Sequence, residues 1–278
     1  MILALLQLCR PYYAMPISLT YLLTVYYARG GAMGGHWAED CLSAAALALT
    51  IASAYVLNDV FDRDVDRINT PSRPLPSGSL RPAVAGAWGG LLAASALGLA
   101  ALCSARFLAA MAALSAALVA YDLFSKRLGP LKQVVVALLM TSYYPLAVLQ
   151  TGGLAGPRAG SLLVFPVWLL ITAWGYELFK DLRDRLGDPP IGGRPTFLQL
   201  HPRRWTRLAG LVVMGASPML VLPMFLGCKW VYMIGAILAI GLAVASAMVS
   251  IRWAIRLIYL ECFITALAAA MDVAVLGI

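Results

Sequence analysis

Long apolar stretches recur along the whole chain, and each is long enough to cross a lipid bilayer as one helix. The hydrocarbon core of a bilayer is about 30 Å thick, which a helix of about 20 residues spans. Of the 278 residues, 62% are hydrophobic and only 12% are charged, whereas soluble proteins average roughly 25% charged residues. The first stretch lacks the early basic region of a cleaved signal peptide. The sequence therefore predicts a polytopic integral membrane protein.

Nine membrane spans can be placed on this pattern. Many of them are rich in Gly, Ala and Ser, which lets neighbouring helices approach closely. We expect one all-α domain that covers residues 1–278. The predicted spans are 11–28, 41–58, 82–103, 107–122, 132–150, 161–180, 206–227, 230–250 and 255–277.

The basic residues predict how the chain is oriented in the membrane. If the N-terminus and the loops after spans 2, 4, 6 and 8 share one side, that side holds 17 of the 21 Lys and Arg residues. By the positive-inside rule this side is cytoplasmic, so the C-terminus lies on the opposite side. The net charge of +8 then reflects membrane orientation. We expect no nucleic-acid partner, and no segment indicates a protein partner.

Cysteine and histidine offer little for a metal centre or a catalytic triad. The five cysteines are scattered and form no CxxC pair, so we interpret them as small apolar side chains. The two histidines, His36 and His201, lie in predicted loops. Polar chemistry must therefore come from the few acidic residues.

An acidic segment follows the second span, beginning at Asn58 and ending at Asp66. In a helix, Asn58, Asp62 and Asp66 share one face because they are four residues apart. Asp64 points to the other side, and Asp59 lies at the edge of the face. A row of oxygen ligands suits a hard cation such as Mg²⁺.

A second acidic segment ends the sixth span. Asp181, Asp184 and Asp188 are spaced i, i+3 and i+7, which again places them on one helix face. Both segments are predicted on the cytoplasmic side, and clustered carboxylates repel unless a positive charge lies between them. Two Mg²⁺ ions that hold a diphosphate would supply that charge.

Basic residues close to these segments fit the same substrate, because arginine matches phosphate geometry in a bidentate way. We assign a phosphate role to Arg67, Arg73 and Lys126. We interpret other basic residues as membrane anchors, namely Lys132, Arg203, Arg204 and Arg207. Glu261 and Asp272 lie inside the ninth span. We expect Glu261 to pair with a basic neighbour.

Four motifs resemble the UbiA superfamily of intramembrane prenyltransferases. Residues 58–66 match its NDxxDxxxD signature, and residues 66–78 (DRINTPSRPLPSG) resemble the loop that follows. Residues 121–127 (YDLFSKR) resemble its Tyr-to-Lys motif, and residues 181–188 (DLRDRLGD) its second aspartate-rich motif. Arg10-Pro11 resembles the pair that opens the first helix in many members. The resemblance extends over nearly the whole chain.

The resemblance implies nine transmembrane helices around a central cavity that opens to the cytoplasm and to the membrane. It implies two Mg²⁺ ions bridging the substrate diphosphate, with metal ligands Asn58, Asp62, Asp66, Asp181, Asp184 and Asp188. It implies a catalytic set of Asp62, Asp66, Asp181 and Lys126. It implies substrate contacts from Arg67, Arg73, Lys126, Arg127, Tyr121 and Arg10.

The implied activity is transfer of a prenyl group from a polyprenyl diphosphate through an allylic carbocation. The acceptor is an aromatic quinone precursor of the hydroxybenzoate kind or another lipophilic molecule. One alternative is that the acceptor is geranylgeranylglyceryl phosphate, an archaeal-type ether lipid. The other is terpene cyclisation without an acceptor. The second motif is more similar to the ether-lipid, chlorophyll and homogentisate branches than to the bacterial hydroxybenzoate branch. An ion-coupled transporter is the rival class, because acidic residues at membrane depth also mark ion pathways.

Overall fold

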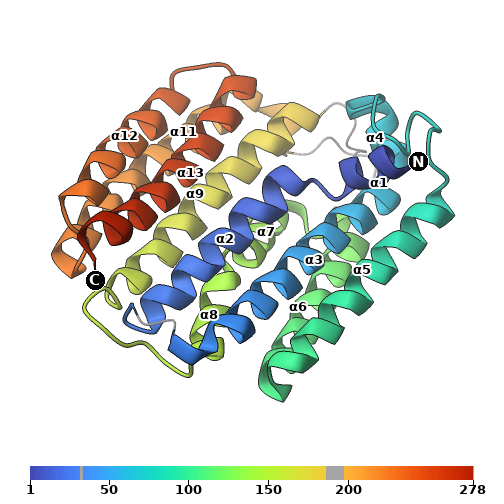
Figure 1. The fold of residues 1–278 in the computed structure, drawn as a ribbon. Coiled ribbons are helices and arrows are strands. Elements are labelled where there is room, and N and C mark those ends of the chain that lie inside the picture. The colour runs from blue at the N-terminus through green and yellow to red at the C-terminus, as the bar shows by residue number, and fades with distance from the viewer. Residues whose placement is uncertain (32–33, 186–196, 278) are drawn as a thin grey trace. The chain divides into compact units, whose positions relative to one another are not determined.

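The computed structural model describes residues 1–31, 34–185 and 197–277, whose regular elements are all helices (Figure 1). The all-α prediction is therefore confirmed. The long helices are α2 (Pro11–Ala28), α3 (Trp37–Phe61), α5 (Pro82–Cys103), α6 (Ala105–Phe124), α9 (Ser161–Asp184), α11 (Pro202–Ala216), α12 (Trp230–Ser246) and α13 (Ile251–Leu276). The shorter helices are α1 (Ile2–Leu8), α4 (Arg63–Asn69), α7 (Lys132–Thr141), α8 (Tyr143–Thr151) and α10 (Phe197–Leu200). Four 3₁₀ segments are η1 (Gly34–His36), η2 (Ser125–Arg127), η3 (Gly129–Leu131) and η4 (Ser217–Leu226).

Seven helical stretches within the described ranges are long and apolar enough to cross a membrane. They are Gly34–Phe61, Pro82–Cys103, Ala105–Phe124, Lys132–Thr151, Ser161–Asp184, Pro202–Leu226 and Ile251–Leu276. The two other predicted spans, 11–28 and 230–250, are also helical and correspond to α2 and α12. α12 has 17 residues and is a shorter apolar helix than these seven stretches. The count of nine stays a prediction.

The chain divides into two compact units. Within the described residues, the first unit contains 1–22 and 34–129, and the second contains 23–31, 130–185 and 197–277. Helix α2 contributes its first part to the first unit and its last part to the second.

In the first unit, close packing of α3 against α5 orders the segment that leads to the first acidic motif. A β-carbon at Gly89 would lie 2.9 Å from Leu57 Cδ2, so a larger residue there would require the Leu57 side chain to shift. Ser53 Oγ donates to the Gly89 carbonyl oxygen at 2.8 Å. Leu75 and Leu80, which follow α4, belong to one buried cluster with α3 and α5. The loop after α4 is thereby anchored to the unit that carries the motif.

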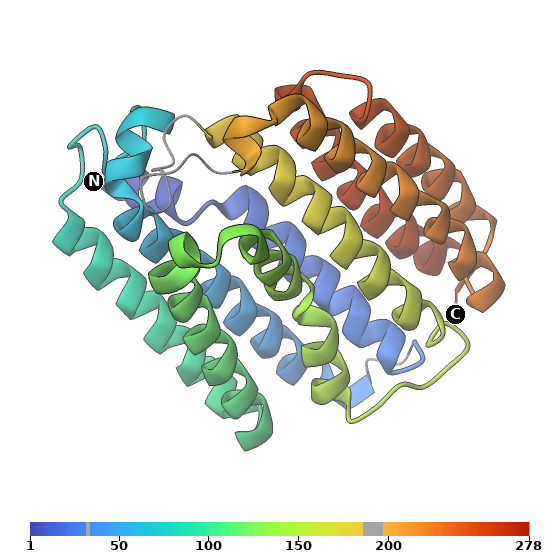
Figure 2. The same ribbon diagram turned by 180° about the vertical axis from the view of Figure 1, so that it is seen from behind.

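In the second unit, α12 and α13 are closely packed and lie side by side in both views (Figures 1 and 2). A β-carbon at Gly235 of α12 would lie 2.2 Å from the β-carbon of Ala268 on α13. Close approach at small residues is how helices associate where lipid removes the hydrophobic drive. Gly235 therefore sets the separation of the two helices.

A buried ion pair joins the last turns of α13 to the rest of the second unit. Arg158 Nη1 donates to Asp272 Oδ2 at 2.6 Å, and both side chains are fully buried. Asp272 also accepts from the backbone nitrogens of Lys229 at 2.9 Å and Tyr232 at 3.0 Å. It thus caps the start of α12 from a different helix. This explains one of the two acidic residues of the predicted ninth span.

The other acidic residue of that span, Glu261, is also completely buried. Within the part of the chain that the structure describes, neither of its carboxyl oxygens has a hydrogen-bond partner. The basic neighbour expected for Glu261 is therefore not found there.

We predict that Gly235→Ala destabilises the protein, whereas Gly241→Ala on the same helix does not. A methyl group at Gly235 collides with Ala268, and overpacking of this kind costs about 1–3 kcal/mol. Space is open around Gly241, so alanine there is neutral or stabilising through helix propensity. Thermal unfolding in detergent measures both, and equal midpoints for the two variants would contradict the packing described.

Candidate functional site

The first candidate cluster is built around Asp59, which is buried near the end of α3. Arg10, between α1 and α2, donates from Nη2 to Asp59 Oδ1. The guanidinium also lies over the ring of Tyr55, 4.6 Å from its centroid. Burial lowers the pKa of Arg10, but the Asp59 carboxylate and other neighbours outweigh this and raise the pKa above its ordinary value. Arg10, predicted to contact substrate, thus has an acidic partner within the chain.

The backbone at Arg10 is strained as well. It has a φ of 45°, and in the described ranges no other residue except glycine has a positive φ. Such conformations persist only where surrounding contacts enforce them, and they gather at functional sites. The ion pair with Asp59 is one such contact.

Arg73 joins Asp59 to another buried aspartate of this unit, Asp66. Its Nη1 lies 3.3 Å from Asp59 Oδ1 and 2.6 Å from Asp66 Oδ2. Thr70 Oγ1 donates to the other oxygen, Asp66 Oδ1, at 2.9 Å. Asp66 therefore has a cation on one oxygen and a neutral donor on the other.

Asn58 forms a separate group with two further aspartates. Its Nδ2 donates to Asp62 Oδ2 at 3.2 Å and to Asp122 Oδ1 at 2.9 Å. Asp122 lies near the end of α6 and was not singled out from the sequence. The signal available was its position directly after Tyr121 in the YDLFSKR motif.

The predicted row of ligands on one continuous helix is interrupted at Asp62. α3 ends at Phe61, and Asp62 has φ −96° and ψ 8° before α4 begins. Helix-like backbone hydrogen bonds continue through the interruption: the Asp62 nitrogen donates to the Asn58 carbonyl oxygen, and the Asp66 nitrogen donates to the Asp62 carbonyl oxygen. Asp64 is 76% exposed and pairs with Arg63 and Arg67, as expected for the opposite side of the helix.

The second candidate cluster lies at the end of α9, in the second unit. Asp181 is buried and accepts from Lys132 Nζ on Oδ1 at 2.8 Å and from Gln133 Nε2 on Oδ2 at 2.7 Å. Both donors begin α7, which packs beside α9 (Figure 2). The sequence predicts a membrane anchor at Lys132, whereas the structure gives Lys132 a carboxylate partner. The role of Gln133 has no signal in the sequence. Asp184, in contrast, is bound by the adjacent Arg183.

The remaining predicted residues divide by how far the structure describes them. Tyr121 is partly buried on α6, and Arg127 is exposed on η2. Arg67 is exposed and pairs with Asp64. The side chain of Lys126 and all of Asp188 lie outside the described residues.

Oxygen donors dominate both clusters, which is the chemistry that Mg²⁺ requires. Across residues 1–31, 34–185 and 197–277, however, no three Asp, Glu, His or Cys side chains converge as a ready metal site. Arginine and lysine side chains bind four of the carboxylates instead, those of Asp59, Asp66, Asp181 and Asp184. The oxygen donors fit a hard cation, which can bind them once these basic side chains move away from the carboxylates.

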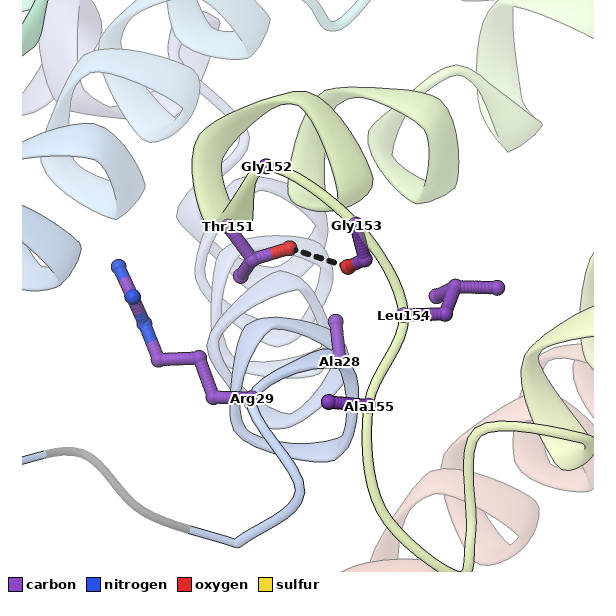
Figure 3. A pocket seen from close by; sticks show the side chains of 7 residues that line it. All are labelled: Ala28, Arg29, Thr151, Gly152, Gly153, Leu154 and Ala155. Atoms are coloured by element: carbon purple, nitrogen blue, oxygen red, sulfur yellow. Dashed lines mark hydrogen bonds between the residues drawn. The ribbon is translucent and has the colours of Figure 1, made fainter.

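A shallow pocket of about 410 Å³ lies at the other end of the second unit, lined by residues 28–29 and 151–155 (Figure 3). Thr151 Oγ1 donates there to the Gly153 carbonyl oxygen at 2.8 Å. The pocket precedes the start of α9, whereas Asp181 is at its end, roughly 30 Å away along a helix of this length. It has no acidic residue, so we do not assign the chemistry to it.

Long apolar helices with charged clusters at their ends define an integral membrane protein. Residues 17–257 match the model of the UbiA prenyltransferase family. The chain belongs to this family and is an intramembrane prenyltransferase, as the motifs predicted.

Similar proteins support this assignment. The digeranylgeranylglyceryl phosphate synthase of Halobacterium salinarum is 28% identical over 244 residues, which cover 87% of this chain and 86% of that protein. The protein of the same name from Methanoculleus marisnigri is 31% identical over 222 residues, covering 79% and 76%. A structure of a UbiA homologue from Archaeoglobus fulgidus bound to GPP and Mg²⁺ aligns with a TM-score of 0.64 at 16% identity, over 99% of this chain and 100% of that one.

We predict that Asp59→Asn lowers the unfolding midpoint strongly, whereas Asp64→Asn leaves it nearly unchanged. Loss of the Asp59 charge leaves Arg10 without its carboxylate partner, and breaking a buried pair costs about 3 kcal/mol. That corresponds to a fall of about 5–10 °C. Asp64 is largely exposed, and surface pairs contribute little. Thermal unfolding in detergent tests this, and an unaffected Asp59→Asn variant would refute the structural role.

Proposed function

We propose that the chain transfers a geranylgeranyl-type prenyl group from its diphosphate to a hydroxyl group of a glycerol-phosphate ether lipid. The observation that carries the proposal is the pairing of buried aspartates with basic side chains at helix ends in both units. Asp66 with Arg73 and Asp181 with Lys132 each place a carboxylate and a cation within 3 Å. A metal-bound diphosphate needs both kinds of group.

The names of the relatives favour this acceptor over an aromatic one. The proteins from H. salinarum and M. marisnigri share the name digeranylgeranylglyceryl phosphate synthase. The second acidic motif, DLRDRLGD, is more similar to the ether-lipid, chlorophyll and homogentisate branches than to the bacterial hydroxybenzoate branch. We therefore prefer the ether lipid to the hydroxybenzoate-like acceptor expected first.

The carboxylates are proposed to hold Mg²⁺, because their oxygen atoms are the hard ligands that this ion prefers. When bound, Mg²⁺ supplies positive charge that stabilises the departing diphosphate. Asn58 donates to two carboxylates, so we assign it to positioning Asp62 and Asp122. The proposed ligands are Asp62, Asp66, Asp181, Asp184 and Asp188, with two ions as the expected number.

The basic residues are proposed to complete the binding of the diphosphate. The carbon–oxygen bond of the prenyl diphosphate breaks, and its electron pair leaves with the diphosphate. Arginine and lysine stabilise that charge, and the proposed residues are Arg67, Arg73, Lys126 and Arg127. The acceptor oxygen then bonds to the allylic carbon and loses its proton. Apolar helices keep water from the carbocation meanwhile.

The proposed orientation places the N-terminus and both acidic segments on the cytoplasmic side of a nine-span domain. It rests on the positive-inside rule and on the 17 of the 21 Lys and Arg residues that the predicted spans place on that side.

An acceptor panel tests the proposed function. Purified protein with geranylgeranyl diphosphate and Mg²⁺ is expected to convert geranylgeranylglyceryl phosphate to a product heavier by one prenyl group. It is expected to leave 4-hydroxybenzoate unchanged and to stop when EDTA is added. Product mass spectrometry distinguishes transfer from cyclisation. Prenylated hydroxybenzoate, or a cyclic terpene without acceptor, would replace the proposal with the corresponding alternative.

Within the first motif, we predict that Asp62→Ala lowers turnover by about 100-fold or more, a loss typical of removing one electrostatic stabiliser. Asp64→Ala is expected to keep most activity, because its side chain is exposed and pairs with Arg63 and Arg67. The release of diphosphate measures both. Similar turnover in the two variants would argue against the assignment of Asp62.

A further inference from the structure

Two buried aspartates in different units share one arrangement of donors. Asp66 has Arg73 on one oxygen and the Thr70 hydroxyl on the other. Asp181 has Lys132 on one oxygen and the Gln133 amide on the other. In each case a flexible cation binds one carboxylate oxygen and a neutral donor binds the other.

The cation in this arrangement occupies the place of a metal. A divalent ion must approach a carboxylate oxygen to about 2.0–2.1 Å, and an ammonium group on the same oxygen would repel it. The neutral donor has no such conflict, because it binds the other oxygen and carries no charge. Metal binding at Asp181 therefore requires Lys132 to move and allows Gln133 to stay.

Lys132 is able to make this move. Its side chain is 28% exposed, and Asp181 is 11% exposed, so the pair borders accessible space. The lysine side chain is a flexible four-carbon stem with a compact charge. A diphosphate that arrives with the metal offers that charge a new partner.

We propose that Lys132 is a positioning residue that holds Asp181 when no metal is bound and transfers to the diphosphate when the metal enters. Gln133 keeps the carboxylate oriented throughout. The metal and the diphosphate then bind as a unit, and either one alone binds weakly. This inference rests on the proposed function, since it assumes a metal-bound diphosphate at Asp181.

The chain contains a matched control for Lys132. Lys180 Nζ bonds Glu177 Oε1 at 2.8 Å, the same distance as the pair of Lys132 with Asp181. Its side chain is 31% exposed, and it is adjacent to Asp181 in sequence. Its partner Glu177 is outside the proposed ligand set, so loss of this pair is expected to leave metal binding unchanged.

The test is equilibrium dialysis of the purified full-length protein against Mn²⁺, with and without inorganic pyrophosphate. Wild-type protein is expected to retain Mn²⁺ about tenfold more tightly when pyrophosphate is present, within the usual range of coupling between two ligands. Lys132→Met is expected to bind Mn²⁺ alone about tenfold more tightly than wild type and to gain less from pyrophosphate. Lys180→Met is expected to match wild type.

Two charge-defined variants complete the design. Lys132→Arg keeps the positive charge and is expected to keep the weak binding of Mn²⁺ alone. Lys132→Gln also removes the charge, and the same result is predicted for it as for Lys132→Met. It replaces Lys132→Met if that variant does not fold. Unchanged Mn²⁺ binding in the charge-removing variants, or equally tight binding in Lys132→Arg, would overturn the inference but not the proposed function. Absence of Mn²⁺ retention by wild type even with pyrophosphate would overturn the proposed function itself.

Discussion

The pairing of carboxylates with basic side chains inside apolar surroundings is the interaction on which this structure depends. A buried charge is tolerated only where an opposite charge and hydrogen bonds compensate for lost water. Asp59 meets this condition through Arg10 and Arg73, and Asp272 meets it through Arg158. The pairs of Arg10 with Asp59 and of Arg158 with Asp272 join residues 49 and 114 positions apart in sequence. The charges therefore act as connections between helices as well as candidate chemical groups.

Close helix packing provides the framework for these pairs. Small residues such as Gly89 and Gly235 bring helices within contact of one another, and the buried leucines of the loop after α4 anchor it to the first unit. Arg73 belongs to that loop, so its reach to Asp66 follows from the anchoring. A polar site in a membrane protein depends in this way on the apolar contacts around it.

Sequence reasoning found the acidic residues but not all of their partners. Residues of one helix turn are related by a fixed period, so the separation of Asp64 from Asp62 was predictable from spacing alone. The roles of Asp122, Lys132 and Gln133 were not, because each contacts a residue 48 or more positions away. A lysine at the start of a span resembles a membrane anchor until the neighbouring helix is placed beside it.

The sequence by itself determined the all-α class, the membrane-spanning character and the family, because these follow from local composition, helical period and short motifs. The interruption at Asp62 and the assignment of each carboxylate to a particular cation were decided only by the tertiary structure. The physical reason is that charge pairing acts through space over a few ångströms. The periodicity along one helix does not determine which basic side chain of another helix lies within a few ångströms of a given carboxylate.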